Sequence, residues 1–369
     1  MQALGLDIGG ANLKAATSGG AACSEPFEMW RAPGELAVRL QKLISRFPPA
    51  DVLAVTMTAE LADCFATKAE GVAAILAAVQ EAAGPAPAVV WQTTGEFAPP
   101  TDAVCRPIAV AAANWHALAT WAGRLAPQGK ALLFDIGSTT SDIIPLHDGR
   151  PVARGLTDLD RLLNHELVYT GLRRTPLCAV AESVTVRGRP CRVAAELFAT
   201  MLDVHLLMGV IPEDCADRHT ADGRPATIAC AHARLARMVC CDRDEIDLAE
   251  ARSIARGFAE AQKSALCSAI GTVVGRHRER LETVIVAGSG EILARKILAE
   301  HPATMGSRIV RLAESLSPDL AESACAYAVA VLATERRQGR SCSRQRIQPG
   351  QGVTQYQANG NDNSRMEDG

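Results

Sequence analysis

One short pattern occurs twice in the chain and limits the folds that it can adopt. Residues 6–11 read Leu-Asp-Ile-Gly-Gly-Ala, and residues 134–139 read Phe-Asp-Ile-Gly-Ser-Thr. In both copies an apolar strand pattern ends in an aspartate, turns at a glycine and is followed by a second strand pattern. A pattern that starts again in this way is typical of internal duplication. We therefore expect two similar α/β domains.

Strand and helix patterns alternate around each copy, as in sheets that are covered by helices. In the first part, strands are expected at 3–8, 13–17, 52–57 and 88–92, and helices at 33–47, 69–83 and 108–125. After a break at 126–129, strands are expected at 131–136, 142–146 and 284–287, with a closing helix at 322–336. We expect domains at 1–127 and 128–336, with a helical and loop-rich insertion at about 155–247 in the second.

Composition excludes several classes of partner. The 38 Lys and Arg residues against 41 Asp and Glu give a net charge of −3, which provides no basic surface for nucleic acid. No stretch approaches the roughly 20 apolar residues of a membrane-spanning helix. The irregularly spaced cysteines and the absence of a signal-peptide pattern favour the cytoplasm. Residues 337–369 are rich in Gly, Gln, Ser and Asn, so we expect a disordered tail there.

The repeated loops have the chemistry of anion sites, because glycines let a turning backbone direct its amide groups at a ligand. Their spacing fits neither a dinucleotide-binding loop nor a P-loop. A third glycine-rich loop follows the strand at 284–287 and opens a helix, which suits close approach by a nucleotide. Candidate phosphate-binding residues are Gly9, Gly10, Asn12, Gly137, Ser138, Thr139 and Thr140, and the nucleotide-type loop is Gly288, Ser289 and Gly290.

These three elements, in this order, resemble the actin/hexokinase/Hsp70 superfamily. The chain also resembles the hydantoinase/oxoprolinase-related branch over about residues 1–335 and, within it, proteins of tetrahydromethanopterin-linked C1 transfer. Besides the two loops, the resemblance depends on residues 55–61 (Val-Thr-Met-Thr-Ala-Glu-Leu), 113–115, 169–176 and 220–225. It implies a duplicated ribonuclease H-like fold with a cleft between two domains.

The resemblance also implies an activity, that of a transferase in methanofuran-type C1-carrier biosynthesis. Such an enzyme joins an aminomethylfuran methyl diphosphate to the phenol of a glutamyl-tyramine and releases diphosphate. The departure of diphosphate is helped by amide donors, a lysine and a divalent cation around its oxygens. We therefore expect Asp7 and Asp135 to hold Mg²⁺ and Lys14 to contact the diphosphate.

The remaining candidates have two interpretations each. Glu60 or Asp142 is expected to take the phenol proton, although a carboxylate in such a position is about as often a helix cap or a surface group. Arg174 and Arg224 are candidates for binding a substrate carboxylate, with solvated loop arginines as the alternative. Asn114 is a further substrate-binding candidate, with a buried structural role as its alternative.

Two other functions remain open from the sequence. An ATP-dependent small-molecule kinase or a hydantoinase/oxoprolinase-like hydrolase would use the same fold, and the loop at 288–290 keeps ATP as an open possibility. A non-enzymatic scaffold that closes on a nucleotide is the second alternative. In each case the partners are small molecules.

Overall fold

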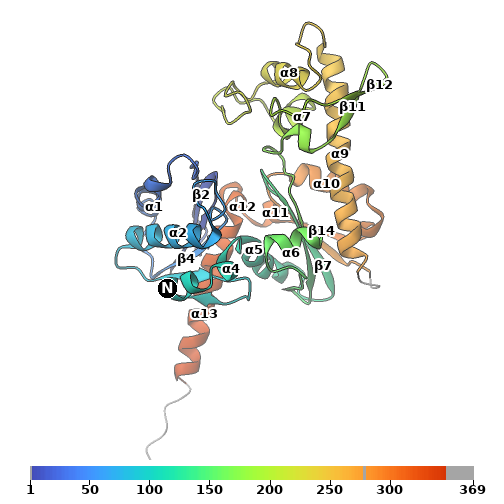
Figure 1. Ribbon diagram of the computed structural model, residues 1–369. Coiled ribbons are helices and arrows are strands. Elements are labelled where there is room, and N and C mark those ends of the chain that lie inside the picture. Colours follow the sequence, from blue (N-terminus) through green and yellow to red (C-terminus); the bar gives the residue numbers. More distant parts are fainter. Residues whose placement is uncertain (1, 277–279, 346–369) are drawn as a thin grey trace, which may run out of the picture. The chain divides into compact units, whose positions relative to one another are not determined.

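A computed structural model describes residues 2–276 and 280–345 of the chain (Figure 1). Residues Met1–Thr334 form one compact unit, and Glu335–Gly369 form a second. The first unit contains both expected sheets. One sheet is built from strands that end before residue 99, and the other from strands that begin at residue 130 or later. No helix in the described part of the chain is both long and apolar enough to cross a membrane.

The first sheet has the strand order β3-β2-β1-β4-β5-β6. β1 pairs antiparallel with β2 and parallel with β4, so the sheet is mixed. β1 and β4 are buried along their whole length, which explains their nearly continuous apolar sequences. The strands are β1 (Ala3–Ile8), β2 (Asn12–Thr17), β3 (Ala22–Pro26), β4 (Val52–Met57), β5 (Ala88–Trp91) and β6 (Phe97–Ala98).

Helices cover both faces of this sheet. α1 (Leu36–Ile44) and α2 (Lys68–Ala83) bury their apolar sides in one core with β1 and β4. On the other face, α5 (Asn114–Ala122) and α13 (Ala324–Gln345) pack in a second core. The sheet is thus buried on both sides, as the alternating strand and helix patterns predicted.

The contact between β1 and α13 leaves no space for a side chain at Gly5. A Cβ atom added there would lie 1.9 Å from the backbone oxygen of Ala326. We expect Gly5→Ala to lower the free energy of unfolding by about 3 kcal/mol, because helix and strand must separate. Chemical denaturation measures this change. Gly34→Ala is the control, since nothing lies within 4 Å of its added Cβ; equal stability of the two variants would contradict the packing.

The second sheet repeats the plan of the first, in the order β10-β8-β7-β13-β14, with β9 also paired to β8. β7 pairs antiparallel with β8 and parallel with β13, as β1 does with β2 and β4. The expected duplication is therefore confirmed. The strands are β7 (Lys130–Ile136), β8 (Ser141–His147), β9 (Arg150–Pro151), β10 (Leu167–Val168), β13 (Thr283–Ala287) and β14 (Arg308–Arg311).

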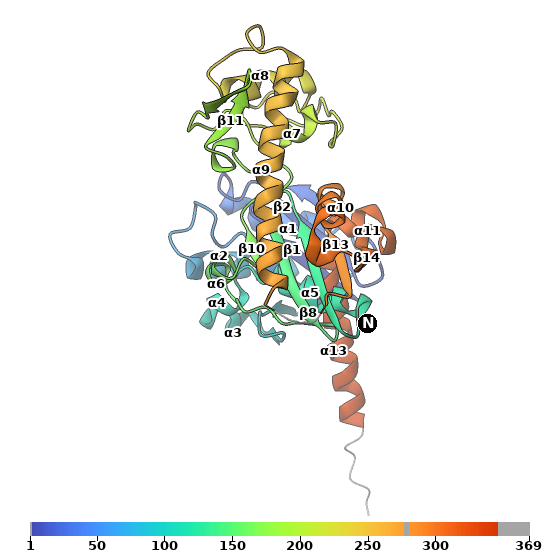
Figure 2. The same ribbon diagram turned by 90° about the vertical axis from the view of Figure 1, so that its right-hand side faces the viewer.

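A separate core lies within the region of the expected insertion. It joins α7 (Met201–Leu207), α8 (Ile228–Arg237) and the first half of α9 (Leu248–Val274). The second half of α9 belongs to the core of the second sheet. In Figure 2 this long helix passes from α7 and α8 to the region of β8 and β10, and it contacts all four elements. A two-stranded ribbon, β11 (Ser183–Val186) with β12 (Arg189–Arg192), completes the insertion.

Three boundaries differ from the sequence expectations. The helix expected at 108–125 is broken, because Ala112 adopts a left-handed backbone conformation (φ 46°) between α4 (Pro107–Val110) and α5. The insertion begins later than residue 155, since α6 (Asp158–Leu163) leads into β10 of the second sheet. The closing helix begins at Ala324 and continues to Gln345, so residues 337–345 of the expected tail are helical; residues 346–369 lie outside the described part.

The remaining helices are short and connect the main elements. They are α3 (Pro100–Cys105), α10 (Glu291–Glu300), α11 (Leu312–Ser315) and α12 (Pro318–Glu322), with 3₁₀ turns at Pro33–Glu35, Gly123–Leu125, Leu177–Ala179 and Pro302–Thr304. The chain passes from the first sheet to the second between β6 and β7, which is the region of the expected domain boundary near residue 127. The boundary itself stays a prediction.

Candidate functional site

The first glycine loop brings an aspartate and a lysine together. Asp7 lies at the end of β1, and Lys14 is its direct neighbour across the pairing of β1 with β2. The turn closes through the Gly9 amide, which donates to the Asn12 carbonyl at 3.0 Å. The Gly9 amide is therefore used within the loop. The amide of Gly10 has no such bond among the described residues, and open space surrounds its Cα.

The second loop closes in the same way. The Gly137 amide donates to the Thr140 carbonyl at 2.9 Å, so Gly137 is the equivalent of Gly9. The Ser138 carbonyl accepts hydrogen bonds from the backbone amides of Arg173 and Arg174, which fixes the loop. The amide of Ser138 bonds to no group in the part that the structure describes. Gly10 and Ser138 are thus among the loop amides that a bound anion can use.

Asp7 and Asp135 influence each other electrostatically. Burial raises the pKa of Asp7 to about 6, and the positive charge of Lys14 partly opposes this shift. Burial also raises the pKa of Asp135 to about 7, assisted by the charges of Asp142 and Asp7 and opposed by Lys14. Asp7, Lys14 and Asp135 therefore lie close enough for their charges to act on one another, and their joint role in binding stays a prediction. Removing such carboxylates from water costs free energy that a bound cation can offset.

The beginning of α13 belongs to the same site. The Lys14 ammonium donates to the Glu322 carbonyl at 2.7 Å, just before this helix. Burial raises the pKa of the Cys325 thiol well above its usual range, and the charges of Asp7 and Asp135 add to the shift. Sequence reasoning missed Cys325, because its apolar surroundings give no signal that the closing helix returns to the first loop.

Asp142 occupies the position in the second loop that Lys14 has in the first. It faces Asp135 across the pairing of β7 with β8. Its carboxylate forms an ion pair with Arg161, whose side chain is only 2% exposed and also lies 3.4 Å from Asp158. The guanidinium lies over the ring of Trp115, 4.3 Å from its centroid. The Asp142 carboxylate is thus already occupied by a buried cation. Arg161 was not predicted, because it is one arginine among many in the sequence.

Glu60 is the other candidate base, and it is buried after the end of β4. Its side chain is 1% exposed, and its Oε2 atom has no hydrogen-bond partner in the described structure. Burial raises the pKa of Glu60 to about 7; the charge of Asp158 also raises it, whereas a hydrogen bond from the Ala112 backbone lowers it. Near pH 7 this carboxyl group is therefore poised to accept or donate a proton.

The raised pKa of Glu60 predicts a pH-dependent difference in stability. From about pH 4.5 to pH 7 the folded state binds this proton more tightly than the unfolded state, so rising pH destabilises the wild type. Glu60→Gln should remove that loss, on the order of 3 kcal/mol, and should be the more stable protein at pH 8. Denaturation of both proteins at pH 4.5 and pH 8 measures the difference. Parallel pH profiles would contradict this account of Glu60.

The third glycine loop packs against the end of the strand that precedes the second loop. A Cβ atom added at Gly288 (φ 83°) would lie 2.2 Å from the Asp135 Oδ1 atom. The Gly290 amide donates to the Ile136 carbonyl at 2.8 Å, whereas Ser289 is exposed. The backbone of this loop therefore packs directly on the strand that carries Asp135. Its use by a nucleotide stays a prediction.

The other substrate-binding candidates lie in different surroundings. The Asn114 side chain accepts from the Trp115 amide at the start of α5. The exposed Arg174 lies 5.2 Å from the ring centroid of Trp30, beside the second loop through its backbone bond to Ser138. Arg224 forms an ion pair with Asp222 at 2.6 Å within the insertion. No described contact joins Arg224 to Asp7 or Asp135.

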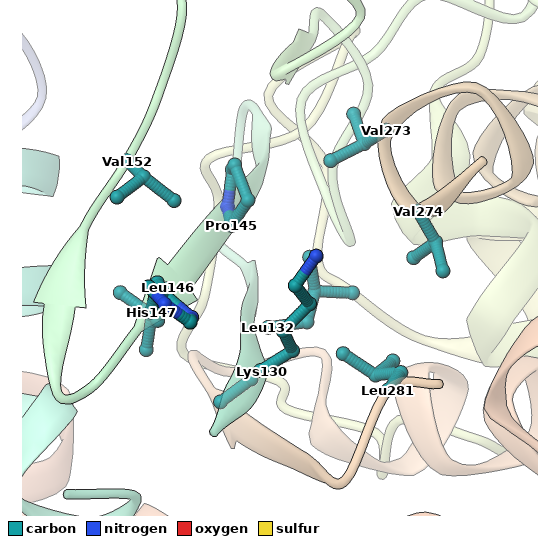
Figure 3. Close-up of a pocket in the computed structure, with 10 residues that line it drawn as sticks. Lys130, Leu132, Pro145, Leu146, His147, Val152, Val273, Val274 and Leu281 are labelled. Carbon is teal, nitrogen blue, oxygen red and sulfur yellow. The ribbon is translucent and has the colours of Figure 1, made fainter. Parts of the chain in front are cut away.

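A cavity of about 260 Å³ lies away from these groups. Figure 3 shows its lining, which comes from the first residues of β7, the end of β8 and the end of α9. Asp135 lies toward the other end of β7. This cavity is therefore separate from the two glycine loops, and most of its lining residues are apolar.

Comparisons with known proteins give consistent results. A model of the hydantoinase/oxoprolinase family matches residues 51–336. Over 332 residues the chain is 32% identical to the (4-{4-[2-(γ-L-glutamylamino)ethyl]phenoxymethyl}furan-2-yl)methanamine synthase of Methanocaldococcus jannaschii, covering 89% of this chain and 96% of that protein. The protein of the same name from Methanococcus vannielii is 29% identical over 201 residues, covering 54% of this chain and 89% of that protein.

A solved structure shares the fold. The nucleotide-free structure of an acetone carboxylase matches with a TM-score of 0.51 at 10% identity, covering 89% of this chain and 70% of that one. Together with the two matching sheets, this likeness confirms the duplicated ribonuclease H-like fold of the actin/hexokinase/Hsp70 type. At such low identity it says nothing about the reaction.

Proposed function

Because the chain belongs to the hydantoinase/oxoprolinase family, we propose that it is a transferase of methanofuran-type C1-carrier biosynthesis. In this proposal it joins the furan-methyl carbon of an aminomethylfuran methyl diphosphate to the phenol oxygen of γ-glutamyltyramine. The ether product is the compound for which the two archaeal relatives are named. The match to the Methanocaldococcus jannaschii protein extends along 89% of this chain and 96% of that protein. This supports a shared activity and not only one shared domain.

The observation that carries the proposal is that Asp7 and Lys14 beside the first glycine loop and Asp135 beside the second interact electrostatically. The amides of Gly10 and Ser138 are open to a ligand, and Lys14 adds a positive charge. In the reaction the bond between the furan-methyl carbon and the diphosphate oxygen breaks, and its electron pair leaves with the diphosphate. These donors then interact more strongly with the leaving group than with the substrate, which lowers the barrier.

The phenol must lose its proton as its oxygen forms the new bond to carbon. Of the two candidate bases, Glu60 suits this step better than Asp142. Glu60 has an unpartnered buried oxygen, whereas the Asp142 carboxylate already pairs with Arg161. A pKa of about 7 for Glu60 also lies closer to that of a phenol than the pKa of an exposed carboxyl group does.

The residues of the site also fit Mg²⁺. No group of three His, Cys, Asp or Glu side chains in the described structure forms a complete metal site. Mg²⁺ is usually held by one or two carboxylates together with substrate phosphates, and Asp7 and Asp135 provide such a pair. The Asp7 Oδ1 atom is buried without a hydrogen-bond partner, as expected of a group that receives a cation. When bound, Mg²⁺ would neutralise charge on the diphosphate oxygens.

The proposal is tested by mass spectrometry of the products. The purified protein is incubated with Mg²⁺, the furan-methyl diphosphate and γ-glutamyltyramine, without any nucleotide. We expect the phenoxymethylfuran ether to form. Ether formation only with ATP, or ADP release when the diphosphate substrate is absent, would favour the kinase or hydrolase function instead. Binding of nucleotide without turnover would favour the scaffold.

A further inference from the structure

A second cavity, of about 540 Å³, is lined by segments whose neighbouring residues Ala112 and Asp158 interact with Glu60. Its volume is within the range of small-molecule binding sites. It combines apolar side chains with hydroxyl groups and one guanidinium. The lining residues are Thr93, Thr94, Cys105, Arg106, Pro107, Ile108, Ala109, Leu156 and Thr157.

Two links connect this cavity to the Glu60 carboxyl group. Thr157 of the lining immediately precedes Asp158, whose charge acts on Glu60. The segment that contains Ala109 leads to Ala112, whose backbone hydrogen-bonds to the Glu60 carboxyl group. Glu60 does not itself line the cavity, but it interacts with residues that directly follow, or closely follow, two of its wall segments. Its free oxygen gives this region a buried acceptor for a proton.

The side chains of the cavity walls are suited to an amphipathic aromatic ligand. Ile108 is 53% exposed and Leu156 is 46% exposed, so each offers apolar surface that no other part of the described protein covers. The Arg106 guanidinium has no hydrogen bond or ion pair within residues 2–276 and 280–345, and it suits a carboxylate. γ-Glutamyltyramine has a phenol ring at one end and a carboxylate at the other.

We propose that this cavity is the binding site of the phenolic acceptor. The ring lies between Ile108 and Leu156, the glutamyl carboxylate pairs with Arg106, and the phenol oxygen lies toward the part of the wall that leads to Asp158 and Glu60. The phenol proton passes to the Glu60 carboxylate as the ether bond forms and diphosphate leaves from the other substrate. The inference rests on the proposed function for the identity of the ligand. The charge and shape of the cavity support it independently.

Arg106→Ala separates this inference from its alternatives, with Arg189→Ala as a matched control at an exposed position on β12. We expect Arg106→Ala to raise the KM for γ-glutamyltyramine about 10-fold or more, with kcat and the KM for the diphosphate substrate nearly unchanged. Arg189→Ala should leave all three unchanged. An unchanged acceptor KM in Arg106→Ala would overturn the assignment.

Direct binding makes the test independent of turnover. Calorimetry should show that Arg106→Ala weakens the binding of γ-glutamyltyramine. The binding of tyramine, which lacks the carboxylate, should not change. Leu156→Asp should weaken both ligands, and retained melting temperatures show that the variants fold. If the wild type binds the acceptor in this way but forms no ether, the proposed reaction fails while the binding site stands. Absence of acceptor binding, with a dimer that Leu156→Asp dissociates, would instead assign this surface to a second copy of the chain.

Discussion

Asp7→Asn and Asp135→Asn are each expected to lower kcat by about 1000-fold while leaving the protein folded. Both carboxylates lie where the diphosphate and its cation are proposed to bind, so an amide removes a charge that the transition state needs. Burial has raised the pKa of Asp7 to about 6 and that of Asp135 to about 7. Their ionised forms therefore oppose folding at pH 8, and neither variant should melt below the wild type.

Steady-state kinetics and thermal melts at pH 8 measure the two effects. Asp244→Asn is the control, because this aspartate is exposed and its side chain has no described hydrogen-bond partner. It should keep full activity. If Asp7→Asn and Asp135→Asn unfold, the two aspartates instead stabilise their turns, and the proposed cation site is wrong.

Lys14→Ala is expected to lower kcat between about 100-fold and 1000-fold, with little change in the KM for the phenol. Among the described residues the Lys14 ammonium hydrogen-bonds to the exposed Glu322 carbonyl, so its removal should cost little stability. The lost rate follows from the absence of a positive charge beside the departing diphosphate.

Steady-state kinetics with each substrate varied in turn separate the effect on kcat from the effect on the KM for the phenol. Lys14→Arg should recover part of the rate because it restores the charge, whereas Lys42→Ala, at an exposed position on α1, should behave as the wild type. A Lys14→Ala variant with unchanged kcat and a raised phenol KM would contradict the role in leaving-group departure.

Local sequence patterns were sufficient for the repeated part of the fold. The two Asp-Ile-Gly turns predicted the equivalent strands β1 and β7, and the turns close through equivalent glycine amides. The break at Ala112 could not be predicted in the same way. Alanine is a good helix former, so the local sequence favours a continued helix over the left-handed conformation that Ala112 adopts.

Residues that enter the site from distant segments were also beyond sequence reasoning. Arg161 reaches the site because α6 places it beside Asp142. Cys325 reaches it because the closing helix starts beside the first loop. Neither position has a local pattern that distinguishes it. The duplication explains a further point: Lys14 and Asp142 are equivalent by strand register, so one loop has a cation where the other has an anion that is neutralised by Arg161.

The central claim is that diphosphate leaves from the two-loop site without help from a nucleotide. Phosphorus NMR of the reaction, with ATP omitted, measures this directly. We expect one inorganic diphosphate to be released for each ether formed, and no release when the phenol is withheld. Release of monophosphate, or ether formation that requires ATP and produces ADP, would contradict the account.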